Sequence, residues 1–152
     1  MQVVILAVGR KLSPEAQKMS DEYDKRLQHW ADLQLRLIAP SKSNAAGVVE
    51  DESKRIMAAI KPDDYVIVLD ERGVQYQNVQ FANHLAKIQE YLKRTVIVIG
   101  GAYGVSDELR DRAQMVWSLS ALVFPHELVR IIVIEQLYRS FAILRNHPYH
   151  HL

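Results

Sequence analysis

Short apolar runs rich in β-branched residues alternate along the chain with longer segments in which apolar residues recur at helical spacing. The runs predict strands at 3–8, 33–38, 65–70 and 95–100, with a fifth in the segment 115–120. The spacing predicts helices over 14–30, 47–60, 79–93, 106–113 and 125–146. Strands and helices in this order form a mainly parallel sheet with helices on both faces, so we expect an α/β fold. Neither a repeat nor a linker interrupts residues 1–152, which are expected to form one domain.

Three polar residues stand where helix N-caps are expected. Ser13 precedes Pro14 at the first helix, Ser106 precedes an acidic first turn, and Asn78 precedes the third helix. In the last helix the β-branched run Ile131–Ile134 would locally suit a strand. Apolar residues keep helical spacing on both sides of that run, so we expect one long helix.

Composition excludes several kinds of chemistry. The chain has no cysteine, which excludes disulfides, a thiolate nucleophile and cysteine-ligated metals. No apolar segment reaches the ~20 residues of a membrane helix, and the opening segment 1–12 lacks the features of a signal peptide. We therefore expect a cytoplasmic protein without a membrane partner.

Charge gives a weak indication of nucleic-acid binding. The net charge of +1 is too small for a protein that binds nucleic acid by charge alone. Four of the six histidines and three arginines do fall in the last 27 residues. From charge alone, a solvated helix face is the better interpretation of these residues.

A glycine-rich turn, VIVIGGAYG at 96–104, follows the fourth predicted strand. Ligands of open α/β sheets bind beyond the carboxyl ends of strands, where Gly100, Gly101 and Gly104 are expected to lie. A turn that is merely tight explains the glycines equally well. The pattern is neither a dinucleotide-binding fingerprint nor a P-loop, which disfavours NAD and ATP.

Two further strand ends carry candidate chemistry. The segment WSLSALVFPH at 117–126 could offer main-chain groups and apolar walls to a flat heterocycle, although such residues more often belong to a core. In LDERG at 69–73, Asp70 and Glu71 are either a carboxylate pair for acid–base work or a solvated strand end. No cluster with metal-ligand spacing accompanies them, so no metal is expected.

The closing segment NHPYHHL, residues 146–152, places an aromatic residue between histidines. Such a segment suits stacking on an unpaired base, whereas an ordinary C-terminus frays. The residues alone leave both interpretations open.

Several of these segments together resemble one known family. The opening strand ends in A-V-G, followed by G-G-x-x-G at 100–104, S-L-S at 118–120, F-P-H-x-L-x-R at 124–130, E-Q-L-Y-R-x-F at 135–141 and H-P-Y-H at 147–150. In this order and spacing, over the whole chain, they resemble the RlmH (YbeA) family of SPOUT-class RNA methyltransferases. The resemblance implies a C-terminal trefoil knot, which a general rule against knotted chains would not have suggested.

The resemblance also implies an activity and a cofactor site. Members of the family use S-adenosylmethionine to methylate N3 of a pseudouridine in the helix 69 loop of 23S rRNA, on assembled 70S ribosomes. The three strand-end loops described above are the ones that the family uses for the cofactor. The implied cofactor-binding residues are Leu69, Gly100, Leu119, Ser120, Ala121, Leu122, Val123 and Phe124.

Roles for other residues follow from the same resemblance. N3 carries a proton that must leave near neutral pH, and our hypothesis gives this task to one of His126, Arg130 and Glu135. We expect RNA contacts from Arg139, Tyr149, His150 and His151. Many relatives have Arg or Lys where His151 stands, so this contact would depend on pH.

The resemblance further implies a homodimer in which one subunit's tail meets the partner's cofactor loop. The last helix is apolar around much of its circumference, which fits burial on two sides or complete burial within one domain. Two other functions remain open. One is a SPOUT methyltransferase that acts on another RNA such as tRNA, and the other is a ribosome-binding or assembly factor without catalysis.

Overall fold

The predicted order of strands and helices is confirmed. The computed structural model describes residues 1–91 and 94–150. The strands are β1 (Gln2–Val8), β2 (Asp32–Ile38), β3 (Tyr65–Val74), β4 (Arg94–Ile99) and β5 (Met115–Trp117). The helices are α1 (Pro14–Leu27), α2 (Ala45–Ala59), α3 (Asn78–Tyr91), α4 (Asp107–Arg112) and α5 (His126–Leu144).

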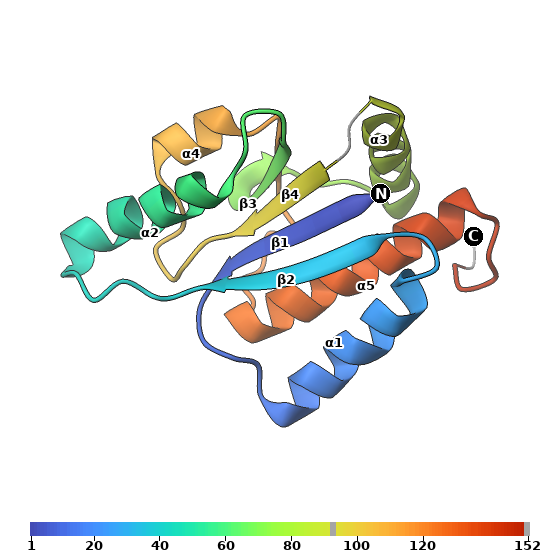
Figure 1. Ribbon diagram of the computed structural model, residues 1–152, viewed down its shortest axis with the longest axis horizontal. Coiled ribbons are helices and arrows are strands. Elements are labelled where there is room, and N and C mark those ends of the chain that lie inside the picture. Colours follow the sequence, from blue (N-terminus) through green and yellow to red (C-terminus); the bar gives the residue numbers. More distant parts are fainter. Residues whose placement is uncertain (92–93, 151–152) are drawn as a thin grey trace.

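The five strands form one parallel sheet in the order β2-β1-β4-β3-β5. Helices cover both faces, with α2 and α4 on one side and α1 and α5 on the other (Figure 1). The third helix packs on α5, so it belongs to the second layer. This is the α/β architecture that the pattern predicted.

Alternate residues of β1 serve two separate cores. Val3, Ile5 and Ala7 pack with residues of α1, α3 and α5. Val4 and Leu6 pack with residues of α2 and α4 on the opposite face. A strand buried on both faces needs an unbroken apolar run, which explains the sequence of this segment.

Strands β3 and β5 differ most in length from the expected runs. β3 continues to Val74 because it keeps pairing with β5 beyond a register shift after Leu69. A Cβ at Gly73 would come within 2.6 Å of main-chain atoms of Val116, so this approach requires glycine. The predicted strand 115–120 is shorter than expected, since pairing ends at Trp117.

Two of the three expected N-caps are confirmed. The Ser13 hydroxyl accepts a hydrogen bond from Ala16 N–H at 3.3 Å, and the Ser106 hydroxyl accepts one from Leu109 N–H at 3.2 Å. The prediction for Asn78 is wrong by one position. The helix begins at Asn78, so Gln77 is the residue that precedes it. The Gln80 side chain accepts a hydrogen bond from Gln77 N–H at 2.9 Å.

The last helix is continuous through Ile131–Ile134, and the strand alternative is excluded. Most of its apolar side chains are buried within the chain itself, where the helix packs against α1 and α3. Leu128, near its beginning, is 42% exposed. Packing within one chain therefore explains most of the apolar circumference, and only the first turns leave apolar surface uncovered. In the part of the chain that the structure describes, no helix has the length and apolarity to cross a membrane.

The connections from β1 and β4 leave the sheet toward opposite faces. β1 continues into α1 on one side, whereas its neighbour β4 continues into α4 on the other (Figure 1). In open α/β sheets, such a change of direction leaves a crevice at the carboxyl ends of the two strands. The fold thus places open space beside the glycine-rich turn.

Candidate functional site

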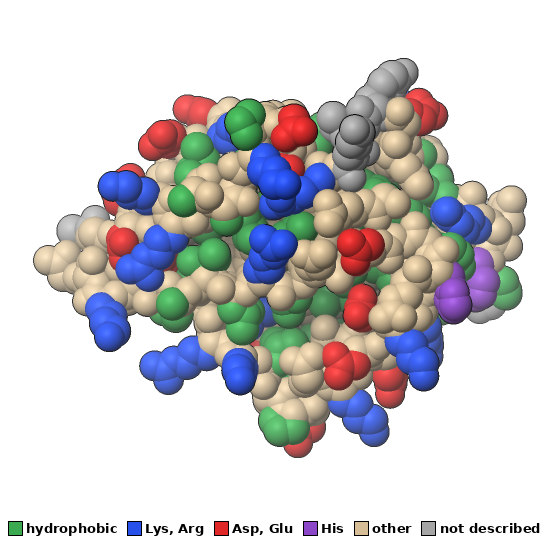
Figure 2. Space-filling view, viewed as in Figure 1, with side chains coloured by type: hydrophobic (Ala, Val, Ile, Leu, Met, Phe, Trp, Pro, Cys, Tyr) green, Lys and Arg blue, Asp and Glu red, His purple; other side chains and the backbone are tan. Residues whose placement is uncertain are grey.

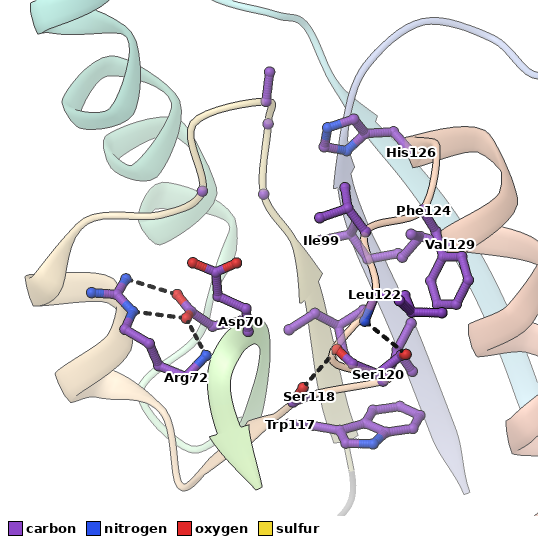
Figure 3. A pocket seen from close by; sticks show the side chains of 18 of the residues that line it. Asp70, Arg72, Ile99, Trp117, Ser118, Ser120, Leu122, Phe124, His126 and Val129 are labelled. Carbon is purple, nitrogen blue, oxygen red and sulfur yellow. Dashed lines mark hydrogen bonds and ion pairs between the residues drawn. The ribbon is translucent and has the colours of Figure 1, made fainter. Parts of the chain in front are cut away.

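A cavity of about 400 Å³ opens at the carboxyl edge of the sheet. Residues 69–72 of β3 and the loops after β4 and β5 line it, and its size is that of a small-molecule site. Figure 3 shows apolar side chains such as Ile99, Phe124 and Val129 along one side and the Asp70–Arg72 pair along another. All of the expected cofactor-binding residues line this one cavity: Leu69, Gly100, Leu119, Ser120, Ala121, Leu122, Val123 and Phe124.

The glycine-rich turn is both tight and close to the cavity. A Cβ at Gly100 would come within 2.8 Å of Val105 Cγ1 and 2.9 Å of Gly104 O. Gly104 has φ of +79°, and its N–H donates to Gly101 O at 3.0 Å. The two interpretations of these glycines are therefore compatible, because the turn that needs them also brings main chain to the cavity wall.

The loop 118–124 is held by hydrogen bonds to its own atoms. The Ser118 hydroxyl donates to Ser120 O at 3.2 Å, and Leu122 N–H donates to Ser120 Oγ at 2.9 Å (Figure 3). Its tip is apolar yet uncovered, with Leu122 at 73% and Val123 at 90% exposure. Exposed apolar side chains at a cavity mouth are typical of a surface that contacts another molecule.

Asp70 does not act as an acid or base near neutral pH. Hydrogen bonds from Arg72 are the main cause that lowers its pKa to about 2, with help from Arg110 and against the effect of burial. Arg110 Nη1 lies 3.0 Å from Asp70 Oδ2 and so links β3 to α4. Asp70 is an ionised anchor of the cavity wall.

Of the three candidate catalytic residues, His126 and Arg130 lie one turn apart beside a second cavity, and Glu135 lies away from both. His126 is the first residue of α5, is exposed, and lines the cofactor cavity (Figure 3). Arg130 is buried one turn later, where its guanidinium donates to Val8 O and Arg10 O, both at 2.8 Å. Burial lowers the pKa of Arg130, but a guanidinium stays protonated in proteins.

Glu135 belongs to a second cluster, two and a half turns along α5. Its carboxylate accepts a hydrogen bond from Arg139 at 2.5 Å and one from the Tyr149 hydroxyl at 3.0 Å. His150 Nδ1 lies 3.4 Å from Arg139 Nη1. Three of the four residues expected to contact RNA thus gather around Glu135, about 13 Å along the helix from His126. The fourth, His151, lies outside the described residues.

The C-terminal segment up to His150 is packed rather than frayed. Trp30 and Tyr138 stack at 5.3 Å between ring centroids, and the Tyr149 ring meets Tyr138 edge-on at 4.7 Å. Burial and hydrogen bonds with Tyr23 and Glu135 raise the pKa of Tyr149, so its hydroxyl stays protonated. Tyr23 and Trp30 could not be predicted as partners of the tail, because nothing in their local sequence indicates a contact with it.

The structure contains no group of three His, Cys, Asp or Glu side chains suited to hold a metal ion, within residues 1–91 and 94–150.

Comparisons with known proteins identify the family of the chain. A family described as "Predicted SPOUT methyltransferase" matches residues 1–150. The chain is 38% identical over 153 residues to "Ribosomal RNA large subunit methyltransferase H" of Gloeobacter violaceus, covering 99% of both proteins. It is 41% identical over 154 residues to the protein of that name from Neisseria meningitidis serogroup C, again over 99% of both. A matching fold, a cavity at the expected loops and full-length similarity lead to one conclusion: the chain belongs to the SPOUT methyltransferase family.

Proposed function

We propose that this protein uses S-adenosylmethionine to methylate N3 of a pseudouridine in the helix 69 loop of 23S rRNA, on assembled 70S ribosomes in the cytoplasm. One observation carries the proposal: three segments from distant parts of the sequence meet at one cavity, and every residue expected to bind the cofactor lines it. The relatives named as large-subunit rRNA methyltransferases support the choice of substrate.

The cavity fits the cofactor in its chemistry. Apolar side chains such as Leu119 and Phe124 offer walls for an adenine ring, while the main chain at Leu69 and Gly100 offers hydrogen-bonding groups. The ionised Asp70 is paired with Arg72 and Arg110, so it fixes this wall of the cavity rather than offering a free charge to the ligand. When bound, S-adenosylmethionine supplies a methyl group on a positively charged sulfur.

The chain's own task is to position the nucleophile and to accept its proton. N3 must lie about 3 Å from the methyl carbon and in line with the departing sulfur. The new N–C bond forms as the C–S bond breaks, and the N3 proton leaves to a base or to solvent. His126 is the one candidate of the three that lines the cofactor cavity, so we assign it this role within the chain. Arg130 holds the loop after β1 in place.

A homodimer would complete the site. The cluster of Glu135, Arg139, Tyr149 and His150 is too far along α5 to reach the cavity of its own chain. The partner's copy of this cluster would meet it across an interface that includes Leu122, Val123 and Leu128, whose apolar side chains are exposed in one chain.

The deciding experiment measures transfer of labelled methyl from S-adenosylmethionine. The acceptors are 70S ribosomes from a strain that lacks this modification, free 23S rRNA and bulk tRNA. Label on the large-subunit RNA of 70S particles alone is the expected result, and digestion to nucleosides then identifies the methylated base. Label on tRNA would replace the proposed substrate. No transfer, together with no binding of S-adenosylmethionine, would leave a ribosome-binding factor instead.

A further inference from the structure

A second cavity, of about 490 Å³, lies beside the cofactor cavity. The segment after β1 and the turn after β4 both line it, which places it at the point where those strands lead to opposite faces of the sheet. This is the position at which open α/β sheets bind ligands. The two cavities share a wall made of Gly101, Ala102, Tyr103 and His126. A molecule in the second cavity would therefore lie next to one in the first.

Positive charge surrounds the mouth of this cavity. Arg10 and Lys11 are exposed in the segment after β1, and Arg130 lies buried behind them with its guanidinium bonded to Arg10 O. Figure 2 shows Lys and Arg side chains projecting from the lower left of the molecule, where β1 and β2 end. The nearby Glu127 carboxylate accepts Ser13 N–H at 2.5 Å and is thereby engaged. The mouth suits a ligand that carries phosphate.

One carboxylate in the cavity wall is only half satisfied. Glu52 of α2 is 4% exposed, and its Oε1 accepts Ser41 N–H at 2.9 Å. Its Oε2 has no hydrogen-bond partner among the described residues. This oxygen lies against the shared wall, since a Cβ at Gly101 would come within 2.2 Å of it. A buried carboxylate oxygen without a donor is costly, so a donor supplied by a ligand would bind here favourably.

We propose that the second cavity receives the target nucleotide of the RNA, and that Glu52 accepts a hydrogen bond from N1–H of its base. The inference rests on the proposed function and adds the residue that selects pseudouridine over uridine. N3 gives up its proton, and the lone pair in that position attacks the methyl carbon. A side chain that accepts a hydrogen bond from the base during transfer must therefore bind the other ring N–H group, which is N1–H. Pseudouridine carries a free N1–H, whereas N1 of uridine is bonded to the ribose.

The cationic residues have a separate task in this arrangement. Lys11 and Arg10 bind the phosphates that flank the target nucleotide, and such contacts strengthen binding without reading the base. Arg130 acts as a positioning residue because it fixes the main chain that carries them. Base selection and backbone binding therefore depend on different side chains.

The test compares two ribosome preparations that carry either pseudouridine or uridine at the target position, the latter from a strain without the corresponding pseudouridine synthase. The readout is kcat/KM for labelled methyl transfer. The wild-type protein should prefer pseudouridine by at least about tenfold, since a site built around a buried acceptor rejects a ligand that lacks the donor. In Glu52→Gln the amide oxygen accepts the hydrogen bond from Ser41 N–H, so the –NH₂ group takes the place of the acceptor Oε2. The preference for pseudouridine over uridine should then fall to less than about threefold.

Matched variants separate selection from general damage. Glu50→Gln makes the same change two residues earlier on an exposed side chain and should keep the wild-type preference. Lys11→Gln should raise KM on both ribosomes alike and leave their ratio unchanged. Binding of S-adenosylmethionine and the melting temperature show whether Glu52→Gln is folded. Glu52→Asp, which keeps the charge but withdraws the oxygens, should also reduce the preference.

The outcomes are distinguishable. Equal methylation of both ribosomes by the wild-type protein, or an undiminished preference in active Glu52→Gln and Glu52→Asp, overturns the role of Glu52 and leaves the proposed function standing. Failure of the wild-type protein to methylate either ribosome overturns the proposed function and this inference with it.

Discussion

At the scale of single residues, the cofactor cavity depends on close approaches that only particular side chains permit. Gly100 and Gly101 bring main chain against Val105 and Glu52, at separations that leave no room for a Cβ. Asp70 holds two arginines at the opposite wall. The sequence indicated the glycines because three of them fall within five residues at the end of a predicted strand, although a tight turn alone would have explained them equally well. The partners Arg110 and Glu52 gave no such signal, since a charged residue on a helix is usually solvated.

Gly100→Ala is expected to weaken cofactor binding by at least about tenfold and to lower stability by about 1–3 kcal/mol, because the new methyl group collides with the turn. Isothermal titration with S-adenosylmethionine and urea denaturation measure the two effects. Gly47→Ala is the control: its Cβ would meet nothing closer than 3.4 Å, and alanine favours the helix. Unchanged affinity in Gly100→Ala would contradict the role assigned to the turn.

The Asp70 anchor makes a pH-dependent contribution to stability. Its pKa falls from 3.8 to about 2 on folding, so the stabilisation is present above the unfolded pKa and is lost as the pH falls through the folded one. The shift sets an upper bound of about 2 kcal/mol, because solvent screens the charge of the exposed Arg72. Asp70→Asn should therefore lower the free energy of unfolding near pH 7 and cost progressively less between pH 4 and pH 2. Urea denaturation across this range is the measurement, with exposed Asp63→Asn as the control that shows no such trend.

At the scale of helices and strands, most of the fold was predictable because each strand of the sheet interior is buried on two faces. The apolar run of β1 and the helical spacing of α5 both follow from this burial. The bounds were less predictable where long-range contacts decide them. The continuation of β3 to Val74 depends on pairing with β5, and the polar residues 70–72 gave no indication of it.

The cap of α4 is an element-scale feature that can be tested. The Ser106 hydroxyl accepts the buried Leu109 N–H, and Ser106 N–H donates to Ser53 Oγ of α2 at 2.8 Å. Ser106→Ala removes only the first bond and is expected to cost about 1–2 kcal/mol of stability in thermal or urea unfolding. Ser106→Thr retains a hydroxyl at the cap and should recover most of the loss. Equal stability of the alanine and wild-type proteins would show that the cap contributes little.

At the scale of the whole molecule, the single chain leaves its candidate site in two parts. The cofactor cavity and His126 lie at the beginning of α5, whereas Glu135 and the tail residues lie about 13 Å further along it. Sequence motifs indicated both groups but not their separation, which follows from the continuity of α5 and the packing of the tail on Tyr138. A twofold-symmetric pair would bring each part to its complement.

The surface that would join the two copies is predicted to include Leu128. This side chain is 42% exposed, so Leu128→Glu should convert a dimer to a monomer at micromolar concentration. Because Leu128 lines neither cavity, cofactor binding by the variant can be tested separately. Light scattering coupled to size exclusion gives the mass. Met19→Glu, on the outer side of α1 at 48% exposure, is the matched control and should leave the mass unchanged. A monomeric wild-type protein would refute the dimer.

Complementation between two inactive proteins tests whether the active site is shared. One variant lacks residues 147–152, and the other carries His126→Ala. If the tail of one subunit serves the cavity of the other, each mixed dimer contains one intact site and one doubly defective site. A one-to-one mixture that has exchanged subunits should then recover about a quarter of wild-type methyl transfer to 70S ribosomes, because half of the dimers are mixed and each has one working site of two. If the tail serves its own cavity, each site in a mixed dimer keeps one defect, and no activity returns.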